Sequence, residues 1–137
     1  MTTVAESLVT LLDANYGAGG GDKPANFIQL LDYRTSPPIY ETNESIIIWL
    51  PVRTRYHPVN ENYTDIEYEI FVHVTTPESD DRCLEISTEV RRIITTTMIA
   101  GMTHQRIDAE ADVGDRQRKV YATELRIVLV KSMEANA

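Results

Sequence analysis

Two stretches of the chain carry hydrophobic residues at the spacing of an amphipathic helix. In residues 4–15 the leucines and a valine recur three and four positions apart, behind threonines that can cap the first turn. Residues 80–100 repeat this spacing, and the segment 75–80 before them supplies capping side chains, a proline and acids suited to a helix start. The pattern predicts two helices, of which the second is long and ends near Gly101. The side chains expected to face its packing partner are Cys83, Ile86, Val90, Ile93 and Ile94.

The middle of the chain has the patterns of β-strands instead. Residues 46–52 form a β-branched run typical of a strand covered on both faces, and Pro51 within it indicates an edge or a bulge. Residues 65–75 alternate between two faces, as a half-buried strand does. The polar stretch 56–62 lies between the two segments, so they are predicted to form a long antiparallel hairpin around that turn.

The order of these elements predicts the fold class. A short apolar run at 27–31 precedes the hairpin, and alternating segments at 107–113 and 119–131 follow the long helix. Antiparallel strands with helices between them are typical of an α+β fold, here a mainly antiparallel sheet of about four to five strands with two helices packed on one face. At 137 residues the chain is expected to be one domain. Its parts are an N-terminal helix at 1–16, a Gly-rich linker at 17–26, the sheet with the main helix at 27–131, and a tail at 132–137.

Charge and composition narrow the class of protein. The chain has 21 acidic residues against 13 lysines and arginines, a net charge of −8, which disfavours general nucleic-acid binding. Arginine far outnumbers lysine, and an acidic, lysine-poor chain is typical of salt-loving microbes or their viruses, although an acidic protein of any cytoplasm is the alternative. No apolar run approaches the ~20 residues of a membrane span, and the first residues lack signal-peptide features. We therefore expect a soluble protein that folds in the cytoplasm.

The residue types that most often carry chemistry are explained here by packing or by turns. Cys83 lies in the apolar stripe of the long helix, where a small core residue is favoured over a reactive thiol. His57, His73 and His104 lack the spacing of metal ligands, and packing is favoured over catalysis for His73. The glycines at 17–21 do not continue into a phosphate-binding motif and indicate a flexible linker. We expect no catalytic residue, no cofactor and no bound metal.

A stretch of alternating acids is a candidate functional surface. These acids are Asp108, Glu110 and Asp112, and their period of two predicts one solvent-facing surface. The residues expected to face inward are Ala109, Ala111 and Val113. A calcium loop is an alternative that fits less well, because the glycine falls one place late and Lys119 replaces the closing Glu. A competing interpretation pairs the acids with Arg116, Arg118 or arginines of a neighbouring subunit, as an interface that salt would weaken.

The layout of the chain resembles a known family. An amphipathic opening at 4–12 comes first, a strand at 68–76 leads directly into the helix at 84–94, and a long strand at 118–130 closes the domain. In length and element order this resembles the tail completion (tail terminator) and neck proteins of tailed viruses. The resemblance covers most of the chain but rests on no diagnostic motif. With the composition, it points to a virus of a salt-loving host.

The resemblance implies a structural virion protein. Such proteins form a ring, expected to be a hexamer, at the head–tail junction, where they cap the tail tube and leave a channel for DNA. The implied partners are other copies of the chain, the tail tube protein and a head-proximal connector or stopper protein, with DNA present only in transit and no membrane. The ring would assemble in the host cytoplasm and remain in the virion.

Two surfaces are expected to serve this role. The three alternating acids would keep the channel or its rim negative, so that DNA slides without binding tightly. The tip of the hairpin would contact a partner, because protruding loops often serve recognition. The tip residues are Tyr56, His57, Asn60 and Asn62. The alternative from another class is a small ferredoxin-like domain that binds a ligand or acts as an enzyme.

Overall fold

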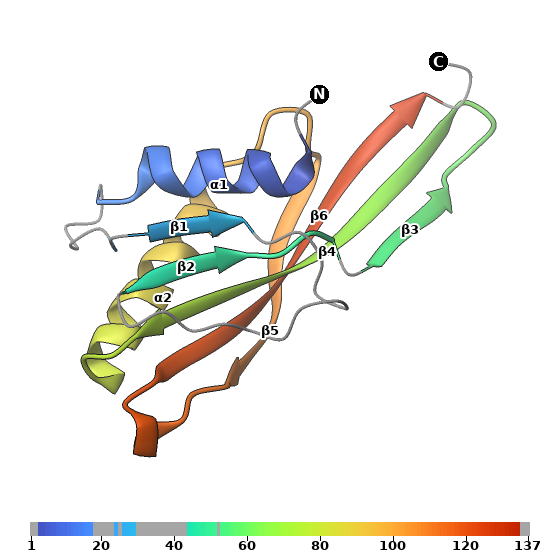
Figure 1. Ribbon diagram of the computed structural model, residues 1–137. Helices are drawn as coiled ribbons and strands as arrows, with labels where there is room; N and C mark the ends of the chain where they lie inside the picture. Colours follow the sequence, from blue (N-terminus) through green and yellow to red (C-terminus); the bar gives the residue numbers. More distant parts are fainter. Residues whose placement is uncertain (1–2, 18–23, 25, 30–43, 52, 135–137) are drawn as a thin grey trace.

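The chain folds into an α+β arrangement in which two helices pack on one face of a mainly antiparallel sheet, which confirms the predicted fold class (Figure 1). The computed structural model describes residues 3–17, 24, 26–29, 44–51 and 53–134. The described elements are α1 (Val4–Asn15), β1 (Asn26–Gln29), β2 (Ser45–Ile48), β3 (Arg53–Pro58), β4 (Tyr63–Thr76), α2 (Asp80–Thr96), β5 (His104–Asp112), the short 3-10 helix η1 (Arg116–Arg118) and β6 (Tyr121–Glu134).

The sheet is organised around the two long strands β4 and β6. They pair antiparallel along their whole length, from Tyr63 opposite Glu134 to Thr76 opposite Tyr121. The strand order is β1-β2-β4-β6-β5, and β3 also pairs with β4, farther along the same edge as β2. Among the strands that the structure describes, only β1 and β2 pair in parallel. The described sheet has six strands because the strand predicted around the run at 46–52 ends at Ile48 as β2, and a separate strand, β3, begins at Arg53, beyond Pro51.

The core lies between the helices and one face of the sheet. All five side chains that the periodicity of α2 assigned to packing are buried there. From α1, Ala5, Leu8 and Leu12 join the same cluster. The sheet contributes alternate residues of its central strands, so the cross-strand pairs Ile70 with Ile127 and Val72 with Leu125 all lie under the helices. The sheet residues of this cluster are Ile46, Ile48, Ile70, Val72, Val74, Leu125, Ile127 and Leu129.

Side-chain hydrogen bonds determine where α2 begins and ends. The helix starts in the predicted segment, and the Ser79 hydroxyl accepts from the backbone amide of Arg82 at 3.1 Å. The prediction that the helix continues to about Gly101 is wrong, because α2 ends at Thr96. The amide group of Gln105, on β5, donates to backbone carbonyls in the last turn and accepts from a backbone amide just beyond it. The carbonyls that end the helix are therefore satisfied by a strand that follows later in the sequence.

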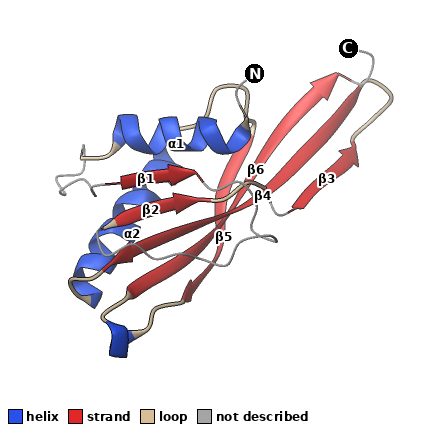
Figure 2. Cartoon of the chain, viewed as in Figure 1, coloured by secondary structure: helices blue, strands red, loops and turns tan. Residues whose placement is uncertain are grey.

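The far end of the sheet projects beyond the helices, as Figure 2 shows. We call this part the arm: β3, the turn at 59–62, residues 63–67 of β4 and residues 130–134 of β6. Every residue of β3 is exposed, whereas the other half of β4 is almost entirely buried. The remaining strands and both helices form what we call the covered half.

The arm corrects two predicted boundaries. The turn predicted at 56–62 is shorter, because β3 continues to Pro58 and places Tyr56 and His57 in a strand rather than at the tip. Asn60 and Asn62 do lie in the turn, where the Asn60 side-chain oxygen accepts from the backbone amide of Asn62 at 2.8 Å. The tail predicted at 132–137 begins later, since β6 continues to Glu134; residues 135–137 lie outside the described residues. Most of the predicted linker at 17–26 also lies outside them.

Candidate functional site

A bulge in β5 separates the three alternating acids. The register of β5 with β6 runs regularly to Ile107 opposite Ile127 and resumes at Ala109 opposite Arg126, so Asp108 is an extra residue. One added residue reverses the alternation of every side chain beyond it. Asp108 consequently lies on the sheet face away from the helices, while Glu110 and Asp112 lie on the α2 side. The prediction that the acids share one surface is wrong for this reason.

The same bulge reverses the alanines that were expected to face inward. Ala109 and Ala111 are both exposed, on the face opposite to Glu110 and Asp112. Val113, beyond the end of β5, is half-buried. The outer part of β5 therefore presents acids to one side and small side chains to the other.

Each of the three acids forms an ion pair within its own chain. Asp108 lies 3.1 Å from Arg126, Glu110 pairs with Arg91 of α2, and Asp112 lies 2.6 Å from Arg116. The backbone amide of Gly114 and the Arg116 guanidinium hold the pKa of the Asp112 carboxyl below its usual value. All three acids remain exposed, between 39% and 52%, so none is buried against the core. Of the two arginines named from the sequence, Arg116 pairs with one of these acids, whereas Arg118 pairs with Asp115 and the other two acids pair with Arg126 and Arg91.

The two arginines predicted beside the acids differ in their contacts. Arg116 bridges Asp112 and Asp80, the first residue of α2, with a 2.9 Å contact to the Asp80 carboxylate. Arg118 is 84% exposed, and its ion pair with Asp115 measures 3.6 Å. Arg116 thus ties the end of β5 to α2, whereas Arg118 is available to solvent or to another molecule.

The sheet face away from the helices carries a network of ion pairs that connects the arm to β5. Glu67 on β4 lies 3.8 Å from each of three basic side chains, Arg55 and His57 on β3 and Arg106 on β5, across the intervening strand β6. Arg106 in turn lies 3.5 Å from Asp108. Arg126 on β6 then joins Asp108 to Glu69 on β4. Cationic and acidic side chains therefore lie beside each other across the strands of this face. The sequence does not reveal this arrangement, because it depends on the register of the paired strands.

His73 is buried on the sheet face away from the helices, with both ring nitrogens engaged. The indole N–H of Trp49 donates to Nδ1 at 3.1 Å, and Nε2 lies 2.8 Å from a carboxylate oxygen of Glu124. Because an indole nitrogen can only donate, Nδ1 is the acceptor, and the ring proton resides on Nε2 and is donated to Glu124. Burial lowers the pKa of His73, and Glu124 opposes this shift. This geometry is that of a packing histidine rather than of a general base with a free nitrogen.

Cys83 is also enclosed by the core. Its thiol lies 3.3 Å from the Thr123 hydroxyl, and burial raises its pKa. Among the described residues, no group of three or more His, Cys, Asp or Glu side chains is placed to hold a metal ion.

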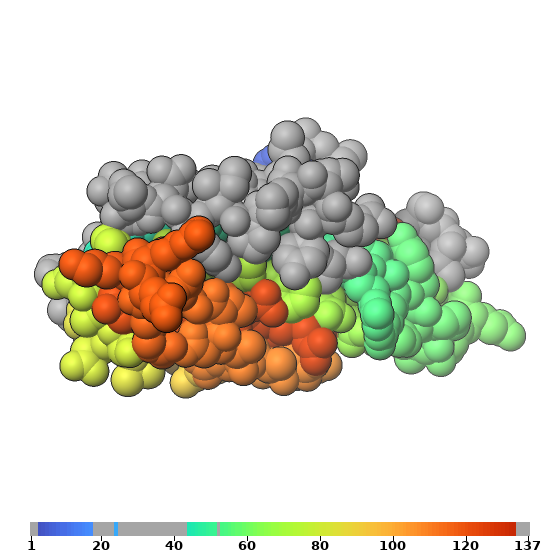
Figure 3. Space-filling view, turned by 60° about the horizontal axis from the view of Figure 1, so that its bottom comes forward, coloured from blue at the N-terminus to red at the C-terminus, as the bar shows by residue number. Residues whose placement is uncertain are grey.

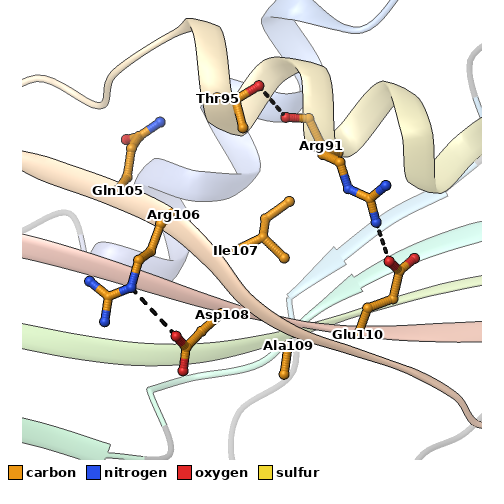
Figure 4. A pocket seen from close by; sticks show the side chains of 8 residues that line it. All are labelled: Arg91, Thr95, Gln105, Arg106, Ile107, Asp108, Ala109 and Glu110. Atoms are coloured by element: carbon orange, nitrogen blue, oxygen red, sulfur yellow. Dashed lines mark hydrogen bonds and ion pairs between the residues drawn. The ribbon is translucent and has the colours of Figure 1, made fainter.

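A groove of about 510 Å³ lies between the second half of α2 and β5 (Figure 4). Ile107 points into it from β5, with the Arg91–Glu110 pair on one side and the Arg106–Asp108 pair on the other. The residues that line it are Arg91, Thr95, Gln105, Arg106, Ile107, Asp108, Ala109 and Glu110. The groove was not foreseen from the sequence, because its two walls come from segments that only the fold brings together.

The arm carries four of the six large hydrophobic side chains that are exposed among the described residues; the other two are Leu84 and Met98. Tyr56 is 68% exposed, Val59 60%, Tyr63 46% and Met133 40%. The register places Tyr56 and Met133 on the same face of the ribbon. Exposed aromatic and apolar side chains on a projecting ribbon are typical of a contact surface.

Comparison with known proteins leaves the family of this chain open. The chain matches none of the protein-family models scanned, and a search of curated proteins finds no match either. Among the described residues, the helices are too short or too polar to cross a membrane.

Proposed function

We propose that this chain is a structural virion protein that forms a ring at the head–tail junction of a tailed virus. The observation that carries the proposal is the arm, a three-stranded ribbon that projects past both helices with exposed edges and exposed apolar side chains. A sheet extension of this kind adds little to the core of its own chain but offers backbone and side-chain groups to a neighbour. The resemblance in element order to tail completion and neck proteins suggests which assembly it serves.

The net charge of −8 supports a channel through which DNA passes without tight binding. The spacing of the acids on β5 predicted that they line the channel. They are weak candidates for that role, since each already pairs with an arginine. In this proposal the negative potential comes from the whole chain, and the arm contacts the neighbouring subunit, the tail tube protein or the connector.

Electron microscopy of the purified chain tests this proposal, alone and after mixing with tail tubes assembled from the tube protein of the same virus. We expect closed rings with a central opening, or caps at the tube ends that stop further growth of the tube. The same measurement on a chain with the turn at 59–62 shortened should show normal folding but fewer capped tubes. A chain that neither forms rings nor caps tubes at any concentration contradicts the proposal.

A ligand-binding domain is the second candidate, and the groove between α2 and β5 is the observation that favours it. Its volume of about 510 Å³ is in the range of small-molecule sites. Its lining is dominated by arginines and acids that already pair with each other, whereas most ligand sites are largely apolar. Binding of a small anionic or zwitterionic compound that is abolished by Arg91→Ala would support this candidate over assembly.

A further inference from the structure

The outer edge of β5 is open in the described part of the sheet, where β5 pairs with β6 alone. Its residues 108–112 are exposed. Figure 3 shows β5, in orange, on the same face of the molecule as β3, in green, but at the opposite end. An exposed edge is a template on which a further strand can add through backbone hydrogen bonds.

The hydrogen bonds to β6 determine which residues of β5 can bond to an added strand. The backbone amide of Val113 donates to the carbonyl of Ala122 at 3.0 Å, so Val113 belongs to a hydrogen-bonded pair with β6. Such pairs recur at every second residue of an antiparallel ladder. The residues between them, Glu110 and Asp112, therefore direct their amide and carbonyl groups outward, to the open edge.

A small pocket that we call the acidic pocket lies beside this edge, between β5 and the first half of α2. Its volume is about 100 Å³. Three acids line it, Asp80 from α2 and Glu110 and Asp112 from β5, together with the exposed side chain of Leu84. A single arginine, Arg116, pairs with both Asp80 and Asp112, so these two acids share one positive charge. The acidic pocket therefore keeps a net negative charge.

The other face of β5, away from the helices, offers a different surface. The small side chains of Ala109 and Ala111 are exposed there, because the bulge at Asp108 reversed their direction. A hollow of about 150 Å³ extends from these alanines across β6 to Phe71 on β4. A large side chain on a strand added to β5 has room above the two alanines.

We propose that the edge of β5 binds an extended segment of another protein, which adds as an antiparallel strand with a lysine or arginine opposite Asp112 and a large apolar residue next in sequence. Residues opposite each other in an antiparallel pair point to the same face of the sheet. The basic side chain consequently lies on the helix side, near the carboxylates of Asp80 and Asp112, with its aliphatic stem against Leu84. The apolar residue lies opposite Ala111, on the other face, above the hollow.

Charge selects a basic segment of a different protein over β3 of a second copy. The amide of Val59 donates to the carbonyl of Tyr63, so the arginines of β3, at even spacing from Val59, bond to β4. The β3 residues that direct their backbone outward are Thr54 and Tyr56, and neither brings a cation to the acidic pocket. The net charge of −8 attracts basic segments of other proteins. The inference goes beyond the proposed function and does not depend on ring formation.

Fluorescence anisotropy with a short labelled peptide tests the binding. The peptide Thr-Thr-Arg-Tyr-Thr-Tyr-Thr, labelled at its N-terminus and amidated at its C-terminus, can place its arginine opposite Asp112 and its first tyrosine opposite Ala111. We expect saturable binding with a Kd below about 1 mM. The same peptide with glutamate in place of arginine should bind about tenfold more weakly, because the acidic pocket repels it. Absence of saturable binding, or equal binding of both peptides, contradicts the proposal.

Methylation of single backbone amides in the peptide tests whether it adds as a strand. In the proposed register the peptide residue opposite Glu110 donates its amide to β5, whereas the residue opposite Ala111 directs its amide away from β5. N-methylation of the first amide should weaken binding about tenfold, and N-methylation of the second should change it less than about twofold. Equal effects of the two methyl groups contradict strand addition in this register.

Amide hydrogen exchange, followed by NMR, locates the edge that binds. A saturating concentration of the peptide should slow exchange of the outward amides of Glu110 and Asp112 about tenfold, because they become hydrogen-bonded. The outward amides of Thr54 and Tyr56, on the open edge of β3, should exchange as before. Protection of the β3 amides, alone or together with those of β5, contradicts the assignment of the site to β5.

A pair of charge variants tests the acidic pocket from the side of the protein. Asp80→Asn with Asp112→Asn should weaken binding of the arginine peptide about tenfold, because the pocket loses its net negative charge. Asp81→Asn with Glu85→Gln removes as many carboxylates from exposed positions of α2 outside the pocket, and should change binding less than about twofold. Equal binding by the two variants contradicts the proposed basic contact.

Two further outcomes remain distinguishable. Melting curves establish whether the charge variants fold, and if Asp80→Asn with Asp112→Asn does not, the comparison of the arginine and glutamate peptides on the wild-type chain decides the role of charge. A chain that binds the peptide at β5 but forms no ring and caps no tube contradicts the proposed function and leaves this site intact.

Discussion

The covered half and the arm are built from the same two strands, yet one is a core and the other a surface. In β4, residues 70–76 are buried except for Phe71, whereas in residues 63–67 only Ile66 is buried. Hydrogen-bonded pairing with β6 continues without interruption through both parts. On the helix side of β4 the difference comes from α1 and α2, which cover Ile70, Val72 and Val74 and leave the arm uncovered. Strand pairing alone therefore does not make a core; a second layer is required.

The two regions consequently hold together by different forces. Burial of aliphatic side chains dominates the covered half, where each large side chain contributes about 1.5–3 kcal/mol. In the arm, exposed cross-strand pairs and ion pairs contribute about 0.2–1 kcal/mol each. A substitution of the same kind should therefore cost far more in the covered half than in the arm, and the predictions below test that difference.

The largest effect is expected from a charge introduced under the helices. Val90→Asp places a carboxylate where the native side chain is fully buried among Ile86, Ile93 and the sheet. We expect a loss of about 4 kcal/mol in the free energy of unfolding or loss of the folded state, measured by urea denaturation. The matched variant Tyr56→Asp in the arm should change it by less than about 0.5 kcal/mol. Similar losses in both variants would show that the arm is a second core.

A smaller effect is expected from removing the charge of Glu44, which forms an ion pair in the covered half. The Glu44 carboxylate accepts from Arg82 at 2.6 and 2.8 Å and from the Thr76 hydroxyl at 2.9 Å. Its bond to Arg82 holds the pKa of Glu44 below its usual value. Glu44→Gln keeps the shape but breaks the two-pronged ion pair, and should cost about 2 kcal/mol by urea denaturation. A loss below about 0.5 kcal/mol would mean that this pair behaves like the exposed pairs of the arm.

The next effect depends on pH and arises from His73. Burial lowers its pKa in the folded chain below the 6.5 of the free side chain, so below that pH the unfolded state binds the extra proton. Its contribution to stability is fully present above pH 6.5 and is lost as the pH falls towards the folded pKa. We expect the free energy of unfolding to fall by up to about 1.4 kcal/mol per pH unit there. His73→Gln should flatten that slope, and a slope that persists in this variant contradicts its assignment to His73.

The sequence reveals the covered half better than the arm, and the reason is physical. Periodicity reports on burial, so the stripe of α2 follows directly from it, and the capping side chains at 75–80 predict where the helix starts. The end of α2 does not, since it depends on Gln105, which only the fold brings to the last turn. The bulge at Asp108 has no local signal either, and this single extra residue places on two faces the three acids that alternation had assigned to one.

The candidate surfaces were foreseen only in part for the same reason. Asn60 and Asn62 lie in the turn where the polar stretch placed them, and Pro51 marks the division between two strands. The charge network depends on which residues lie across from each other. Register is a property of paired strands, and alternation within one strand cannot supply it.

The smallest effect is expected from the charge network that spans the arm and β5. Glu67→Gln removes the acid that Arg55, His57 and Arg106 share, each at 3.8 Å. These contacts are long, and the basic partners are between 43% and 54% exposed, so water and salt screen them. We expect a loss below about 0.5 kcal/mol in urea denaturation at low salt, and none at about 1 M salt. A loss as large as that of Glu44→Gln, or one that persists in high salt, would show that the network holds the arm to the covered half. The arm would then be a rigid extension of the core rather than a surface kept for a partner.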